Sequence, residues 1–86
     1  MIEIGSFVRS MHGGDKDNIY IVKGILLKSV VLVDGNGKTL EKPKTKNIKH
    51  IEDLKEVAEK IAEKFKTNQK VFDAEVYSAI NKFKTK

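Results

Sequence analysis

The stretch that decides the fold is residues 13–33, GGDKDNIYIVKGILLKSVVLV. It opens with turn-forming residues and continues into two segments rich in β-branched and aromatic residues, which favour strands. Gly24 interrupts these segments, and a glycine inside a strand usually marks a bulge or a sharp bend. The pattern predicts a small, strongly bent antiparallel sheet with strands over residues 18–28 and 29–34.

Further strands are predicted on both sides of this stretch. Apolar and polar residues alternate over residues 5–11, as in a half-buried first strand. Residues 34–38, DGNGK, contain Asp-Gly and Asn-Gly pairs, which supply the positive φ angles of a hairpin turn. We therefore expect residues 39–41 to return as a strand antiparallel to residues 30–33.

After residue 52 the hydrophobic period changes to that of a helix. Apolar residues recur at the spacing of one helix face: Leu54, Val57, Ala58, Ile61, Ala62 and Phe65. Asp53 and Glu56 have the spacing of a capping box, and Asp73 is placed to cap a second, shorter helix. We expect the two helices to form an antiparallel hairpin over residues 52–86 that packs on the sheet, which gives an α+β fold.

The charge is uneven along the chain. The net charge is +5, and residues 1–51 carry nine basic and five acidic side chains, whereas residues 52–86 carry eight and seven. Such a field favours a polyanion, either nucleic acid or an anionic membrane surface, although many small proteins are basic without a specific partner. The chain has no cysteine, and no apolar run approaches the roughly 20 residues that cross a bilayer. We expect a cytoplasmic protein with no membrane partner.

Sequence motifs for catalysis are missing. His12 and His50 lie in turn-like or basic surroundings without metal-ligand spacing, and Asp15, Asp17 and Asn18 match only a fragment of a calcium loop. The sequence contains no P-loop, dinucleotide-binding or nucleophile-elbow motif. We therefore expect no enzymatic activity, no metal, no cofactor and no small-molecule substrate.

The most basic segment, residues 38–50, holds five lysines, one histidine and one carboxylate. Pro43 removes a backbone donor, so the segment is expected to be an edge strand or a loop. Lys42, Lys44 and Lys46 alternate, and in an extended chain they would project to one side about 6.5 to 7 Å apart, close to the spacing of phosphates. The same lysines would also protect a sheet edge from aggregation, and both roles can hold.

The glycine-rich loop of residues 12–18 has two interpretations. Adjacent glycines let backbone N–H groups approach a phosphate closely. The alternative is an ordinary flexible connection, which the residues by themselves favour.

Several short motifs resemble those of the KOW-domain RNA-binding proteins, in particular short bacterial relatives of KOW-type large-subunit ribosomal proteins. They are Gly5-Ser6-Phe7-Val8, Gly14-Asp15-Lys16, Tyr20-Ile21-Val22, Val31-Leu32-Val33-Asp34-Gly35, Pro43-Lys44, Ile48-Lys49-His50 and, in the last helix, Asp73-Ala74-Glu75. The resemblance implies a small SH3-like β-barrel over residues 1–51 whose loops bind RNA, with ribosomal RNA as the expected partner. Together with the helical hairpin, this barrel is expected to form a single structural domain.

Two departures from the family pattern concern the first loop. Family members commonly have glycine where this chain has Asp17, and often arginine where it has Gly14. An added acid and a missing base weaken the case for phosphate contact by this loop and shift the prediction toward the lysines after Lys38.

We expect a non-catalytic, ribosome-associated RNA-binding protein acting in translation, which contacts structured RNA mainly through its backbone. The candidate RNA-binding residues are Arg9, Lys16, Lys38, Lys42, Lys44, Lys46, Lys49 and His50. The alternative is a protein-interaction module of the same fold in translation or transcription, with ribosomal proteins among the partners; it would expose an aromatic patch and bind independently of salt. Dimerisation through the helices is a third interpretation.

Overall fold

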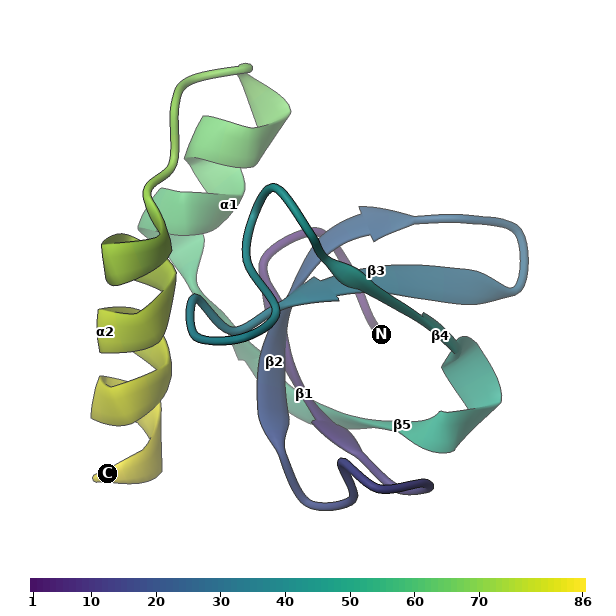
Figure 1. The fold of residues 1–86 in the computed structure, drawn as a ribbon. Coiled ribbons are helices and arrows are strands. Elements are labelled where there is room, and N and C mark those ends of the chain that lie inside the picture. Colours follow the sequence, from purple (N-terminus) through teal and green to yellow (C-terminus); the bar gives the residue numbers. More distant parts are fainter.

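The computed structural model describes residues 1–86 and shows five strands, one short 3-10 helix and two α-helices (Figure 1). The elements are β1 (Ser6–Ser10), β2 (Ile19–Ile25), β3 (Ser29–Val33), β4 (Lys44–Asn47), η1 (Ile48–His50), β5 (Ile51–Val57), α1 (Glu59–Lys66) and α2 (Asp73–Lys84). A five-stranded antiparallel sheet with two helices confirms the α+β class. Neither helix has the length and apolar character needed to span a membrane.

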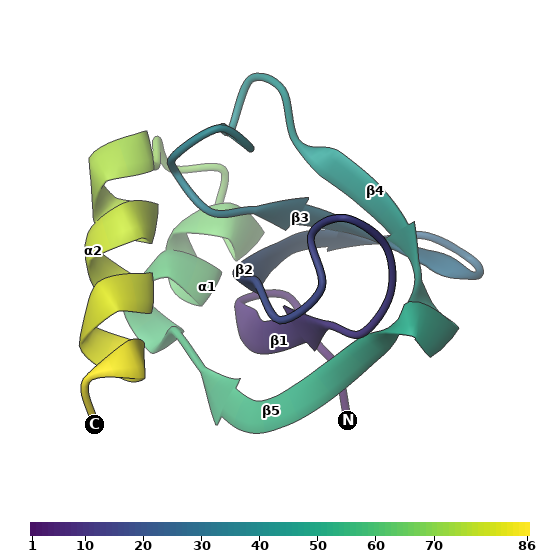
Figure 2. The ribbon, with the colours of Figure 1, turned by 60° about the horizontal axis from the view of Figure 1, so that its bottom comes forward.

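The strand order in the sheet is β4-β3-β2-β1-β5, so the two edge strands follow one another in the chain and are separated only by η1. The sheet therefore curls, and both edges lie toward η1 in Figure 2. It is not closed into a barrel, because no ladder joins β4 to β5. The register between β2 and β3 shifts between Val22 and Gly24, which confirms the bulge predicted at this glycine.

The strands are buried on both faces. One face carries Phe7, Ile21 and Val33, which pack against Ile61 of α1 and Val76 and Ile80 of α2. Successive side chains of a strand point to opposite faces, so the neighbouring residues line the concave side of the curled sheet. This second cluster consists of Val8, Tyr20, Val22, Val30 and Leu32.

The return strand after the glycine turn was predicted in the wrong place. Residues 39–41 form no strand, and the partner of β3 is β4, with Leu32 opposite Lys44. The N–H of Leu40 donates to the Asp73 carboxylate and that of Lys42 to Thr39, while Pro43 has no N–H to offer. Pairing with β3 therefore resumes only after the proline.

The helix expected from residue 52 was also wrong in its first half. Residues 51–57 form β5, which pairs with β1, and the helix begins at Glu59. Lys55 has a left-handed φ of 61°, which a helix cannot accommodate, and the Asp53 carboxylate accepts the Lys55 N–H instead of capping a helix. The sheet thus extends beyond the boundary expected near residue 51.

The second helix confirms its predicted position but neither its predicted cap nor its predicted shortness, because α2 has 12 residues and α1 has 8. Asp73 is the first residue of α2, and its carboxylate binds Leu40 rather than the helix terminus. Glu75 accepts the Phe72 N–H and pairs with Lys64 of α1 at 2.7 Å. Its hydrogen bond from Lys64, followed by that from Phe72, lowers the pKa of the Glu75 carboxyl.

Candidate nucleic-acid interface

The centre of the basic part of the molecule is one acidic residue, Asp15, in the loop between β1 and β2. Its Oδ1 atom accepts hydrogen bonds from Ser10 at 3.0 Å and from Lys46 at 2.7 Å, and its Oδ2 atom accepts one from Tyr20 at 2.9 Å. The ammonium group of Lys44 lies 3.5 Å from Oδ2. Asp15 therefore ties the loop to β1, β2 and β4 at once.

The ionisation of this cluster follows from its burial and its hydrogen bonds. Burial would raise the pKa of the Asp15 carboxyl, but the donors Lys46, Tyr20 and Ser10 outweigh burial and hold the pKa well below its usual range. Burial, joined by the nearby Asp15 charge, raises the pKa of the Tyr20 hydroxyl to about 12. At neutral pH the cluster thus contains an ionised carboxylate and a neutral phenol.

The Asp15 cluster brings residues that are distant in sequence to one end of the sheet. Lys46 also donates to the backbone carbonyl of His12, and the rings of His12 and His50 lie 4.5 Å apart. The Met11 N–H donates to the His50 carbonyl, which fastens η1 to the end of β1. Partial burial and then the charges of His12, Lys49 and Lys46 lower the pKa of the His50 imidazole.

We call this collection of residues the basic end of the molecule. It comprises His12, Lys16, Lys44, Lys46, Lys49 and His50, drawn from the first loop, β4 and η1. Five of the eight candidates named from the sequence are in it, and Lys44 and Lys46 project to the same side of β4 as expected, since both reach Asp15. His12 was missed as a member, because only the fold brings it against His50.

The remaining three candidates lie elsewhere. Arg9 precedes Ser10 on β1, so its side chain projects to the opposite face, where its Nε and Nη2 atoms both donate to Oε1 of Glu52, at 2.9 and 2.7 Å. Lys38 and Lys42 lie in the connection between β3 and β4, which is anchored to α2 through Leu40 and Asp73.

The glycine-rich loop has both free and engaged amides, because the N–H groups of residues 12–15 donate to no acceptor in the protein. The N–H groups of Lys16, Asp17 and Asn18 donate to carbonyls within the loop and β1. Asp17 has a left-handed φ of 75°, a conformation that favours glycine. The loop is thus a folded turn held by Asp15, with the amides of its second half engaged and those of its first half free.

A polar hollow of about 260 Å³ lies between the glycine turn after β3 and helix α2. Its lining includes Asn18, Asn36, Tyr77, Ile80, Asn81 and Lys84. The turn approaches α2 so closely that a Cβ on Gly35 would lie 2.2 Å from the Asp73 carbonyl oxygen. Sequence analysis did not identify this hollow, because its walls come from three separated segments.

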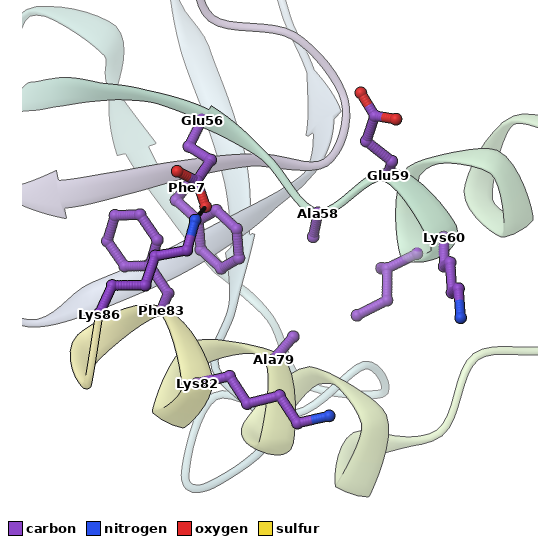
Figure 3. Close-up of a pocket in the computed structure, with 10 residues that line it drawn as sticks. Phe7, Glu56, Ala58, Glu59, Lys60, Ala79, Lys82, Phe83 and Lys86 are labelled. Atoms are coloured by element: carbon purple, nitrogen blue, oxygen red, sulfur yellow. Dashed lines mark hydrogen bonds and ion pairs between the residues drawn. The ribbon is translucent and has the colours of Figure 1, made fainter.

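A second hollow of about 260 Å³ lies between β5, the start of α1 and the end of α2, and Figure 3 shows it to be apolar at its base. The rings of Phe7 and Phe83 stack there with their centroids 4.4 Å apart. Lys86 and Glu56 form an ion pair at its edge. This apolar hollow lies at the surface, beside the core cluster that includes Phe7 and Ile61.

Comparison with models of known protein families and with curated proteins finds no significant match for this chain.

Proposed function

We propose that this protein is a non-catalytic RNA-binding protein of the KOW type, whose basic end contacts the phosphates of structured RNA. The observation that carries the proposal is the Asp15 cluster, because it gathers cationic side chains from three segments onto one end of the sheet. Lysines provide point charges, which give affinity for the backbone more than sequence readout. Ribosomal RNA, in the cytoplasm, is the proposed target.

Two features of the fold support the resemblance to KOW proteins. The edge strands β4 and β5 are joined by a single 3-10 turn, so the curled sheet brings its two edges toward each other. We propose that it is a partly open SH3-like barrel. Asp17 adopts the left-handed conformation at the position where the family pattern has glycine. The local backbone of this loop is therefore the one that a glycine would favour, although the residue differs.

The geometry changes which lysines are expected to bind. Only 10% of the Lys46 side chain is exposed and its ammonium already has two partners, so Lys46 acts by holding the loop on β4. Lys16 and Lys49 are exposed without an ion pair, and Lys44 makes only the longer contact with Asp15. These three are proposed as the main phosphate contacts.

The test is binding to ribosomal RNA fragments across a salt series with Lys16, Lys44 and Lys49 replaced together by Gln. Each phosphate contact contributes roughly 0.7 to 0.9 to the slope of log K against log salt, so the triple variant should lose about two to three units. The matched control replaces Lys60, Lys66 and Lys82, which form no ion pair, by Gln. The control changes the net charge equally, and equal loss of slope in both variants would refute a localised interface.

One observation favours a second candidate, a protein-interaction module. The turn between β2 and β3 exposes Ile25, Leu26 and Leu27, and Leu27 is 96% exposed. Apolar residues are unusual at a hairpin tip, where polar turn formers dominate. If replacing Leu26 and Leu27 by Ser abolishes binding to a ribonucleoprotein while the lysine variant leaves it intact and insensitive to salt, protein contact is the primary function.

A further inference from the structure

The polar hollow between the glycine turn and α2 is lined by side chains that have no part in the proposed phosphate contacts. Its lining includes two apolar side chains, Ile19 and Ile80, of which Ile80 is 3% exposed. Its walls carry the amide side chains of Asn36 and Asn81, neither of which makes a hydrogen bond within the protein. Amides present a donor and an acceptor side by side, as the edges of nucleobases do.

An aromatic ring completes the walls. Tyr77 is 46% exposed, and its hydroxyl has no protein partner. Tyr77, Asn81 and Lys84 recur at i, i+4 and i+7 on α2, so they lie along one face of the helix. A flat heterocycle with a polar edge is a ligand that two apolar side chains, an aromatic ring and free amides can bind together.

Asp34, the acidic residue in the lining of the hollow, uses only one of its two carboxylate oxygens within the protein. Oδ1 of Asp34 accepts the backbone N–H groups of Asn36 and Lys38, at 2.9 and 3.0 Å. Its other oxygen makes no hydrogen bond in the protein and is free to accept from the N–H groups of a base. The volume of about 260 Å³ is several times the roughly 30 Å³ share of one water molecule, which leaves room for a single base.

The hollow continues from the segments that carry the proposed phosphate contacts. Asn18, on its rim, ends the same loop that holds Lys16, and Lys38 follows the turn that forms its opposite wall. Lys84 lies on the rim itself and forms no ion pair. If a base lies in the hollow, the phosphates on either side of it would therefore be near Lys16, Lys38 or Lys84.

We propose that this hollow binds one unstacked base of the RNA, such as a bulged nucleotide, while the basic end holds the flanking backbone. The inference rests on the proposed RNA-binding function and adds base recognition to it. Base recognition in single-stranded or bulged RNA uses stacking on aromatic rings and hydrogen bonds to base edges, and the hollow offers both.

The test compares an RNA hairpin carrying a single-nucleotide bulge with the same hairpin carrying an abasic site at the bulge. The wild-type protein should bind the bulged base roughly ten-fold more tightly than the abasic site, the usual size of one base–aromatic contact. Replacing Asn36 and Asn81 together by Ala should remove most of this preference without changing the salt slope. Both side chains are exposed and unbonded, so the variant is expected to fold normally.

Tyr77 provides an independent measurement. Tyr77→Ser should abolish the preference for the bulged base, whereas Tyr77→Phe retains the ring and should keep most of it. Equal binding of bulged and abasic hairpins by the wild type, with a normal salt slope, would overturn the base site while leaving the phosphate interface intact. Loss of salt-dependent binding altogether would instead refute the proposed function. Nucleoside monophosphates binding as tightly as the bulged hairpin would overturn the assignment to RNA.

Discussion

Two loops of this protein are fastened to the rest of the fold by different physical means. The loop of residues 12–18 is held on β4 by charge, through the contacts of Asp15 with Lys46 and Lys44. The connection of residues 34–43 is held on α2 by close packing at Gly35 and by one hydrogen bond from Leu40 to Asp73. The first attachment should respond to pH and salt, and the second should respond mainly to the size of side chains.

The difference matters for function because each attachment builds one proposed subsite. The charged attachment brings the residues of the basic end together. Lys46 makes the structural contacts with Asp15 and His12, and Lys16 and Lys49 have no ion pair. The packed attachment forms the wall of the polar hollow. Breaking either attachment selectively should therefore separate backbone affinity from base recognition.

The largest effect is expected from Gly35→Ala. The new Cβ would lie 2.2 Å from the Asp73 carbonyl oxygen and 2.8 Å from the Tyr77 nitrogen, and φ is +75°. Steric overlap and left-handed strain together should lower the free energy of unfolding by about 3 kcal/mol or more. Denaturant unfolding would measure this change.

Gly37 gives the matched control. It also has a positive φ, +95°, but a Cβ there would meet nothing within 4 Å. Gly37→Ala should therefore cost only the backbone strain, about 1 kcal/mol. Equal losses in the two variants would show that α2 does not pack on the turn as closely as the structure indicates.

The charged attachment should be the next most sensitive. Asp15→Asn leaves the ammonium group of Lys46, whose side chain is only 10% exposed, without its counter-charge. We expect a loss of about 2–3 kcal/mol in the free energy of unfolding. Asp17→Asn in the same loop removes the same charge from an exposed residue and should change stability by less than about 0.5 kcal/mol. Asp15→Asn, unlike Asp17→Asn, should also weaken the proposed RNA binding, because the loop of residues 12–18 would lose its ionic contacts with β4.

How far the sequence predicts this architecture depends on the range of the interactions. The three central strands and the second helix follow from local pattern, and Gly24 correctly marks the bulge. Residues 51–57 were misread because Leu54 has helical spacing with later residues, yet it packs on the same core from a strand. Only pairing with β1, a long-range contact, distinguishes the two.

The candidate site divides in the same way. Pro43 predicts an edge strand or a loop in this basic segment, and residues 44–47 form the edge strand β4. The pairing of Lys46 with Asp15, and of Arg9 with Glu52, cannot be read from the sequence because the partners are 31 and 43 residues apart. The polar hollow escapes sequence analysis for the same reason, since its lining combines the first loop, the glycine turn and α2.

A third prediction concerns pH, and the charged attachment determines its sign. The pKa of Tyr20 is raised from 10.0 to about 12, so the folded state favours the neutral phenol. Its stabilising contribution is present in full below about pH 10 and is lost as the pH rises toward 12. Tyr20→Phe should reduce the alkaline loss of stability, measured by unfolding at several pH values. The Tyr77→Phe variant, in which Tyr20 is the only tyrosine, should show tyrosinate absorbance with a midpoint near 12. A midpoint near 10 would contradict the burial of the Tyr20 hydroxyl and its hydrogen bond with Asp15.

The smallest effect on stability should come from filling the apolar hollow beside α2 with a larger side chain. Ala79 lines the apolar hollow next to the stacked rings of Phe7 and Phe83 (Figure 3). Ala79→Leu would place apolar atoms in this space, and we expect a gain of about 0.5–1 kcal/mol in the free energy of unfolding. Ala74→Leu makes the same substitution on the same helix at an exposed position, so it should give no comparable gain. Because the hollow lies away from Asp15, the stabilised variant should keep the wild-type dependence of stability on pH and salt. A changed pH dependence would show that the two attachments are coupled through the sheet.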